Sequence, residues 1–109
     1  MPDALVVLTN LPDREAALQL AHLLVERRLA ACVNVLAEGT SVYRWRGTME
    51  SATEVPVLIK TRVGLYPEVE AAILAQHSYE LPEIVAVPVT YGLAAYLDWV
   101  SGETTTAIE

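Results

Sequence analysis

The side chains with the clearest potential for chemistry are one cysteine and two histidines. Cys32 offers a thiolate, a soft ligand for copper or zinc, although a lone cysteine among small apolar residues is more typical of a packed hydrophobic side chain. His77 is expected at the end of a helix, close in sequence to Glu80 and Glu83. It can therefore ligate a metal or order the following loop by hydrogen bonding. His22 falls on the polar face of another predicted helix and is expected in solvent.

Metal-binding spacings are absent from the sequence. There is no CxxC, HxH or HExxH, so neighbouring residues cannot close a site of three or four ligands. A tight site would need residues from distant segments or from two subunits. We therefore expect that no cofactor is required and that copper or zinc, with His77 and Cys32 as candidate ligands, would bind weakly.

A second group of side chains combines charge with aromatic rings. Its members are Tyr43, Trp45, Glu54, Lys60, Tyr79, Glu80 and Glu83. Lys60 is the only lysine and is expected in an apolar strand, where it either extends to solvent or meets a carboxylate in a cleft. Tyr79 and Trp45 suit the wall of a ligand pocket or an interface between subunits. Except for Tyr43, these residues form our candidate intersubunit cleft.

The pattern does not indicate an enzyme. There is no nucleophile with an adjacent base, no glycine-rich phosphate loop and no acid/base pair at a diagnostic spacing. The carboxylates Glu80 and Glu83 flank Pro82 in a predicted loop, where acidic side chains are mostly solvated.

Length and composition limit the class of protein. The 109 residues predict one domain over 1–109, with a polar tail at about 103–109. A net charge of −7 disfavours nucleic acid as a partner, because binding requires a basic surface. A single cysteine, no signal-peptide pattern and no long apolar run predict a cytoplasmic protein without a membrane partner. The hydrophobic content of 53% favours association between subunits.

Hydrophobic periodicity predicts alternating strands and helices. Strands are expected over 4–9, 31–46, 53–62 and 84–90, and helices over 13–29, 64–77 and 92–100. Gly39 suggests a bulge or bend within the long second strand. Beyond it, Ser41, Tyr43 and Trp45 are expected on one face of the strand.

This order predicts an α+β, ferredoxin-like βαββαβ fold with a long protruding hairpin and a short C-terminal helix. Both main helices should cover one face of an antiparallel sheet. Pro56 is expected beside only one neighbouring strand, and Pro88 on an edge strand, because proline cannot donate to a ladder. The open face and the long hairpin arms predict association with further copies.

Five short segments occur in a particular order along the chain. They are LAACVNV at 29–35, SVYRWRG at 41–47, LIKT at 58–61, HSYELPEI at 77–84 and YLDW at 96–99. In order and spacing this set resembles the CutA divalent-cation-tolerance family. The resemblance implies a compact homotrimer with strands added across subunits. It also implies that Thr9, Gln76 and His77 occupy positions where some relatives are proposed to bind copper.

Three functions remain open at this stage. The first is a non-enzymatic CutA-like trimer involved in the response to metal ions, with weak binding of copper or another divalent metal. The alternative is a PII-like trimeric sensor or scaffold that binds an anionic small molecule in intersubunit clefts, with Lys60 as the anchor. The third is a stable docking body for partner proteins.

Overall fold

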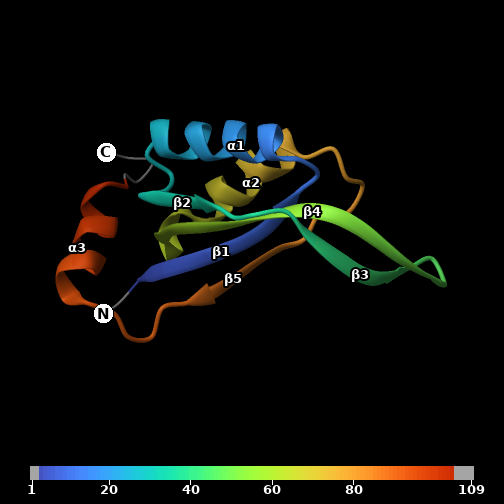
Figure 1. Ribbon diagram of the computed structural model, residues 1–109. Helices are drawn as coiled ribbons and strands as arrows, with labels where there is room; N and C mark the ends of the chain where they lie inside the picture. The colour runs from blue at the N-terminus through green and yellow to red at the C-terminus, as the bar shows by residue number, and fades with distance from the viewer. Residues whose placement is uncertain (1–2, 105–109) are drawn as a thin grey trace.

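A five-stranded antiparallel sheet carries two helices on one face and a third helix at one end (Figure 1). The computed structural model describes residues 3–104. The strands are β1 (Ala4–Leu11), β2 (Cys32–Val35), β3 (Gly39–Trp45), β4 (Thr48–Arg62) and β5 (Ile84–Pro88). The helices are α1 (Arg14–Glu26), α2 (Tyr66–Gln76) and α3 (Ala94–Gly102), with a short 3-10 turn at Val63–Leu65. None of the helices in residues 3–104 has the length and apolar character required to span a membrane.

The core lies between the sheet and the helices α1 and α2. Alternate residues of the two central strands point towards the helices, and Val7 of β1 pairs directly with Ile59 of β4. Both side chains are fully buried. From the helices, Leu20 and Ile73 fill the same core. The predicted alternation in the strands and the helical periodicity therefore produce a common apolar layer.

Helix α1 begins and ends at recognisable signals. Asp13 is its N-cap, and its side chain accepts a hydrogen bond of 2.8 Å from the backbone N–H of Ala16. The helix ends earlier than the predicted boundary at 29, because Arg28 adopts a left-handed conformation with φ of 59°. The Arg28 side chain then donates to the carbonyl of Gly102 at the end of α3.

The predicted long strand 31–46 is two strands separated by residues 36–38. Val35 pairs with Val57, whereas Gly39 pairs with Glu54. Three residues of one strand therefore lie opposite two of β4, which is the geometry of a bulge with one extra residue. The irregularity expected near Gly39 is confirmed, and it separates the sheet body from the hairpin.

Pro56 lies beside one paired strand. It lies in the central strand β4, paired with Asn10 of β1 on one side, and its carbonyl accepts a hydrogen bond from Leu36 on the other. Leu36 lies after the end of β2 at Val35, so β1 is the one strand that pairs with Pro56, as predicted. Proline is tolerated because its nitrogen points towards the interruption between β2 and β3, where no ladder bond from an N–H is required. Pro88 does end the edge strand β5, as expected.

The β3–β4 hairpin extends beyond the body of the molecule (Figure 1). β4 begins at Thr48 rather than at the predicted residue 53, and it is 15 residues long. A two-residue turn joins the strands, with positive φ at both Arg46 and Gly47. Turns of this type match the right-handed twist of the strands.

The end of the described chain packs against the sheet. Arg62 of β4 donates to the hydroxyl of Thr104 at 2.8 Å and to its carbonyl at 3.1 Å, and Thr104 is buried. Thr104 thus belongs to the packed domain rather than to the predicted polar tail. The remainder of that tail, 105–109, lies outside the described residues.

Candidate functional site

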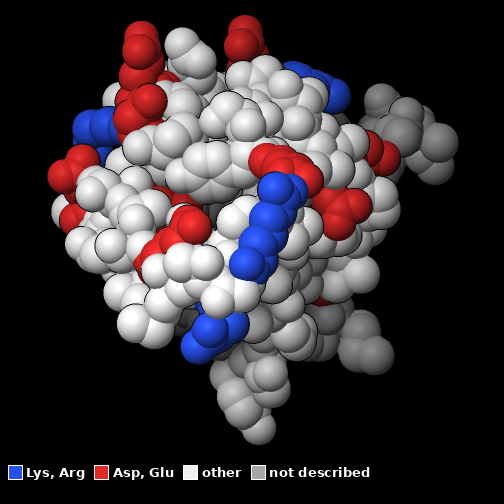
Figure 2. Space-filling view, turned by 90° about the vertical axis from the view of Figure 1, so that its right-hand side faces the viewer, with Lys and Arg blue, Asp and Glu red and all other residues white. Residues whose placement is uncertain are grey.

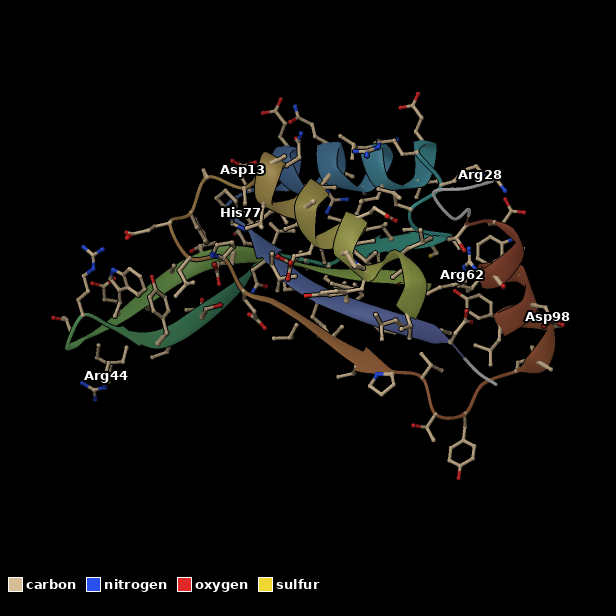
Figure 3. The ribbon with its side chains drawn as sticks, turned by 180° about the vertical axis from the view of Figure 1, so that it is seen from behind. Asp13, Arg28, Arg44, Arg62, His77 and Asp98 are labelled. Atoms are coloured by element: carbon tan, nitrogen blue, oxygen red, sulfur yellow. The ribbon has the colours of Figure 1, made fainter. Side chains whose placement is uncertain are left out.

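A cavity of about 880 Å³ lies between the β3–β4 hairpin and the loop that follows α2. We call it the hairpin cavity. Its walls are Asn10, Ser41, Val42, Tyr43, Trp45, Glu50, Ala52, Glu54 and residues 79–85. Figure 3 shows His77 at the base of the hairpin and Arg44 near its tip. Five of the predicted cleft residues, namely Trp45, Glu54, Tyr79, Glu80 and Glu83, line this one cavity.

The register of the hairpin explains which side chains face the cavity. Ser41 pairs with Ala52, and Tyr43 pairs with Glu50. Because side chains alternate along a strand and directly paired residues share a face, these residues and Trp45 point to the same side. The alternation predicted for the strand beyond Gly39 is thus confirmed.

His77 orders the loop that forms the other wall. Its Nδ1 accepts the backbone N–H of Tyr79 at 3.2 Å, so Nε2 is the atom that donates to the carbonyl of Asn10. Its ring also packs against the Tyr79 ring, with centroids 4.5 Å apart. Both ring nitrogens are therefore engaged, and of the two predicted roles this geometry favours loop ordering. A metal would have to displace one of these contacts.

The carboxylates of the cavity differ in their surroundings. Glu80 accepts two hydrogen bonds from Arg46, at 2.9 and 3.0 Å, in an exposed ion pair of the kind that contributes little to stability. Glu83 accepts a hydrogen bond of 2.8 Å from the side chain of Asn10. Glu54 is only 9% exposed.

Tyr79 reports the environment around Glu54. Burial is the main cause that raises the pKa of the Tyr79 hydroxyl above its ordinary value of 10.0, followed by its contact with the Glu54 carboxylate. A phenol held neutral beside a buried carboxylate can donate a hydrogen bond to it. The base of the cavity is therefore acidic and partly shielded from water.

Lys60 and Cys32 lie outside this cavity. They are cross-strand partners in β4 and β2, and the Lys60 ammonium donates to the side chain of Asn34. Lys60 is six positions from Glu54 along β4, a separation of about 20 Å. Within one protomer, the candidate cleft is thus divided into an acidic cavity and a separate lysine.

Cys32 is a free, partly buried thiol beside α3. The pKa of the nearby Tyr96 hydroxyl is raised, mainly by burial of that tyrosine and then by its contact with Cys32. His77 contacts Asn10, which lies opposite Pro56 of β4. Cys32 lies opposite Lys60, which is four positions further along the same strand. The two candidate metal ligands are therefore not brought together within the chain.

The other positions considered for copper do not form a ligand set either. Thr9 is buried in the core at 2% exposure, and Gln76 is exposed at the end of α2. In residues 3–104, no three side chains of His, Cys, Asp or Glu are grouped closely enough to hold a metal ion.

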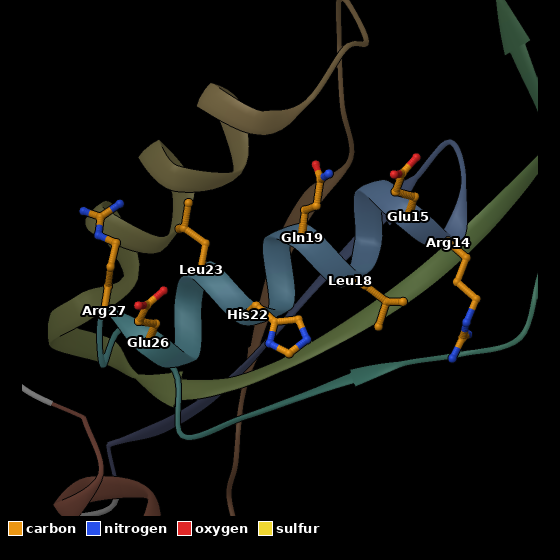
Figure 4. Close-up of a pocket in the computed structure, with 8 residues that line it drawn as sticks. All are labelled: Arg14, Glu15, Leu18, Gln19, His22, Leu23, Glu26 and Arg27. Atoms are coloured by element: carbon orange, nitrogen blue, oxygen red, sulfur yellow. The ribbon is translucent and has the colours of Figure 1, made fainter.

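A second hollow, of about 890 Å³, follows the outer surface of α1 (Figure 4). All of its walls come from residues 14–27 of the one helical segment. His22 is exposed there, as expected. Because the hollow brings together no residues distant in sequence, the hairpin cavity is the stronger candidate site.

Asn10 and Glu50 are polar cavity residues that were not among those selected from the sequence. Asn10 was interpreted only as a break between the first strand and helix, and Glu50 precedes the predicted start of its strand. The hairpin register would have revealed Glu50 opposite Tyr43. On the hairpin side of the molecule, acidic and basic groups are scattered over a mostly uncharged surface (Figure 2).

Residues 3–104 thus form an α+β protein with one antiparallel sheet, three helices and an acidic cavity beside its hairpin. The family model of the CutA1 divalent ion tolerance protein matches residues 5–103. The chain belongs to this family, and the resemblance seen in its ordered segments is confirmed.

Individual relatives agree in sequence and in structure. The chain is 43% identical over 99 residues to the divalent-cation tolerance protein CutA of Thermus thermophilus, covering 91% of this chain and 96% of that protein. It spans 56% of the chloroplastic CutA of Arabidopsis thaliana, at 40% identity over 93% of this chain.

Two solved structures show the same fold. CutA from Xylella fastidiosa superposes with a TM-score of 0.91 at 38% identity, covering 94% of this chain and 99% of that chain. The CutA of Archaeoglobus fulgidus, described as a periplasmic divalent cation tolerance protein, gives 0.88 at 37% identity, covering 92% and 97%.

Proposed function

We propose that this protein contributes to the tolerance of divalent cations as a non-enzymatic homotrimer located in the cytoplasm. The observation that carries the proposal is the family match, which extends over residues 5–103. The free thiol of Cys32 supports a reducing compartment.

The subunit is proposed to be ferredoxin-like. If β2 and β3 are counted as one interrupted strand, the element order is βαββαβ followed by α3. The order of the strands across the sheet, β2-β4-β1-β5, places the first and third of these four strands at the centre.

The exposed apolar side chains near β5 support the trimer. Val87 on this edge strand is 50% exposed, and Tyr91 and Leu93 in the segment that follows are 91% and 75% exposed. An edge strand with adjacent apolar side chains is suited to pairing with another copy of the chain.

Direct binding of divalent cations is proposed to be weak in the isolated protomer. The carboxylates of the hairpin cavity prefer hard cations, but they do not form a cluster of three ligands within residues 3–104. Tighter binding of copper or zinc would require ligands from two protomers, with His77 and Cys32 as the candidates.

Isothermal titration of the whole protein with copper, zinc and cobalt tests direct binding. Saturable heat at millimolar metal is expected, and removal of the metal by a chelator should leave the fold intact, because the core contains no metal ligand set. Absence of heat with all three metals would remove direct binding. A growth assay in a bacterium that lacks its own CutA, at elevated divalent metal, separately tests the role in tolerance.

Within one protomer, no basic side chain is placed to bind an anionic ligand in the hairpin cavity. Lys60 is about 20 Å from Glu54 along β4, and no lysine or arginine lines the hairpin cavity. No observation in the structure favours the PII-like function over the CutA-type function.

A further inference from the structure

Glu54 and Lys60 are charged side chains of opposite sign, and within residues 3–104 neither belongs to an ion pair. Glu54 is only 9% exposed, and the group beside it is the neutral hydroxyl of Tyr79. Lys60 is half-buried and donates to the neutral side chain of Asn34. A charge withdrawn from water without a counter-ion is costly. Each of the two is therefore suited to an opposite charge that comes from outside the protomer.

Both charges lie on the face of the sheet that the helices leave uncovered, which we call the open face. The two residues are six positions apart on β4, and side chains an even number of positions apart share a face. Val57 and Ile59, which alternate with them, are buried in the core against α1 and α2. Glu54 is at the hairpin end of the open face, whereas Lys60 is towards Arg62 at the α3 end (Figure 3). A separation of about 20 Å prevents them from pairing within one chain.

An apolar row separates the two charges on the open face. Leu8 of β1 pairs with Leu58 of β4 on one side and with Val85 of β5 on the other, and directly paired residues share a face. Leu58 lies between Glu54 and Lys60 along β4, at an even number of positions from each, so the row belongs to the open face. Val85 is 49% exposed. An apolar surface with a charge of each sign at its two ends is complementary to a second copy of itself.

We propose that Lys60 of one copy pairs with the Glu54 carboxylate of a neighbouring copy, beside the apolar row that the contact covers. The inference rests on the homotrimer of the proposed function and adds the contact that orients its copies. In a ring of three, every interface joins two different patches. Each copy therefore supplies Lys60 to one neighbour and receives Lys60 at Glu54 from the other. An ammonium has three donors, so the bond to Asn34 leaves two for the carboxylate.

A carbodiimide applied to the unsubstituted protein tests the contact directly, because it couples an amine to a carboxylate where the two touch. Lys60 is the only lysine, so a lysine cross-link identifies its partner without ambiguity. We expect peptide mapping to find an amide between Lys60 and Glu54, in chains that are covalently joined to one another on a denaturing gel. Lys60→Arg retains the charge but has no reactive amine. It should abolish this cross-link and leave the association intact.

Charge reversal tests how much the pair contributes to association. Glu54→Lys and Lys60→Glu should each lower the association constant at least about tenfold, because like charges then meet. The double variant carries the pair in the reverse sense and should recover most of the association. Glu26→Lys and Arg14→Glu make the same changes of charge at exposed positions of α1 and should associate as the unsubstituted protein does. Sedimentation equilibrium over a dilution series measures all of these variants.

Two results would overturn the pairing while leaving the trimer of the proposed function in place. The first is a species of three chain masses in which Lys60 forms no amide with Glu54. The second is a double variant that associates no better than the two single variants. A monomeric unsubstituted protein would instead remove the trimer and the pairing together.

Discussion

Thr9 and Thr61 are buried threonines on the adjacent strands β1 and β4, and both face the helices. The hydroxyl of Thr61 donates a hydrogen bond of 2.6 Å to the carbonyl of Leu29. The hydroxyl of Thr9 is buried without a partner in residues 3–104. A buried hydroxyl without a hydrogen bond loses its hydration and gains nothing in return.

Substitution of each threonine by valine should therefore have opposite effects. We expect Thr9→Val to raise the free energy of unfolding by about 1 kcal/mol, and Thr61→Val to lower it by about 1–2 kcal/mol. Urea denaturation of both variants measures the difference. Equal destabilisation by the two substitutions would contradict the assignment of Thr9 as unpartnered.

Tyr79 predicts a pH dependence at the alkaline end. Because burial and then Glu54 raise its pKa above 10.0, the folded state holds the phenol neutral to a higher pH than the unfolded chain does. This stabilisation is fully present below about pH 10 and is lost as the pH rises through the folded pKa.

Urea denaturation across this alkaline range tests the prediction. The free energy of unfolding should fall less steeply with pH in Tyr79→Phe than in the unsubstituted protein, and Tyr66 and Tyr96, whose pKa values are also raised, account for the remaining fall. Identical slopes would show that the Tyr79 phenol has the same environment in both states.

At the scale of elements, the hairpin depends on its turn and on the bulge at 36–38. The bulge changes the pairing by one residue between β2 and β3, and the turn at Arg46 and Gly47 returns the chain with matching twist. Together they place Tyr43 and Trp45 opposite the loop after α2.

Gly47→Ala should destabilise the hairpin by about 1 kcal/mol, because φ is 82° at this position and a Cβ disfavours that conformation. Gly39→Ala is the matched control, since it has no positive φ and a Cβ there would meet nothing within 4 Å. Hydrogen exchange of the hairpin amides measures both variants. Equal loss of protection would contradict the role of the turn.

The elements themselves were largely predictable from the sequence. The apolar alternation of β1 and the helical periodicity of α1 are local patterns, and each matches the burial that is observed. The surroundings of Pro56 were not predictable from the proline alone, because they depend on the point at which β2 stops pairing with β4.

The candidate site was predicted only in part for the same reason. Trp45 and Tyr79 line the same cavity because of the hairpin register and the loop ordered by His77, which are both non-local. The sequence alone was enough to predict that Lys60 and Glu54 lie apart within one chain, because six positions in a single strand span about 20 Å. Whether the two residues meet between copies depends on the assembly.

At the scale of the whole molecule, the protein is elongated, with extents of 44, 26 and 23 Å. The hairpin extends from one end, and Tyr91 and Leu93 present apolar surface in the segment after the edge strand. Exposed apolar side chains beside an edge strand are suited to contact with another copy of the chain. The proposed homotrimer would account for both features, since strands and apolar side chains would be covered by neighbouring copies.

Sedimentation equilibrium at micromolar concentration tests the central claim most directly. The account predicts a single species of about three times the 11.9 kDa chain mass, and Leu93→Asp should shift it towards smaller species by placing a charge in the interface. A folded species at the mass of one chain, unchanged by dilution, would contradict the account.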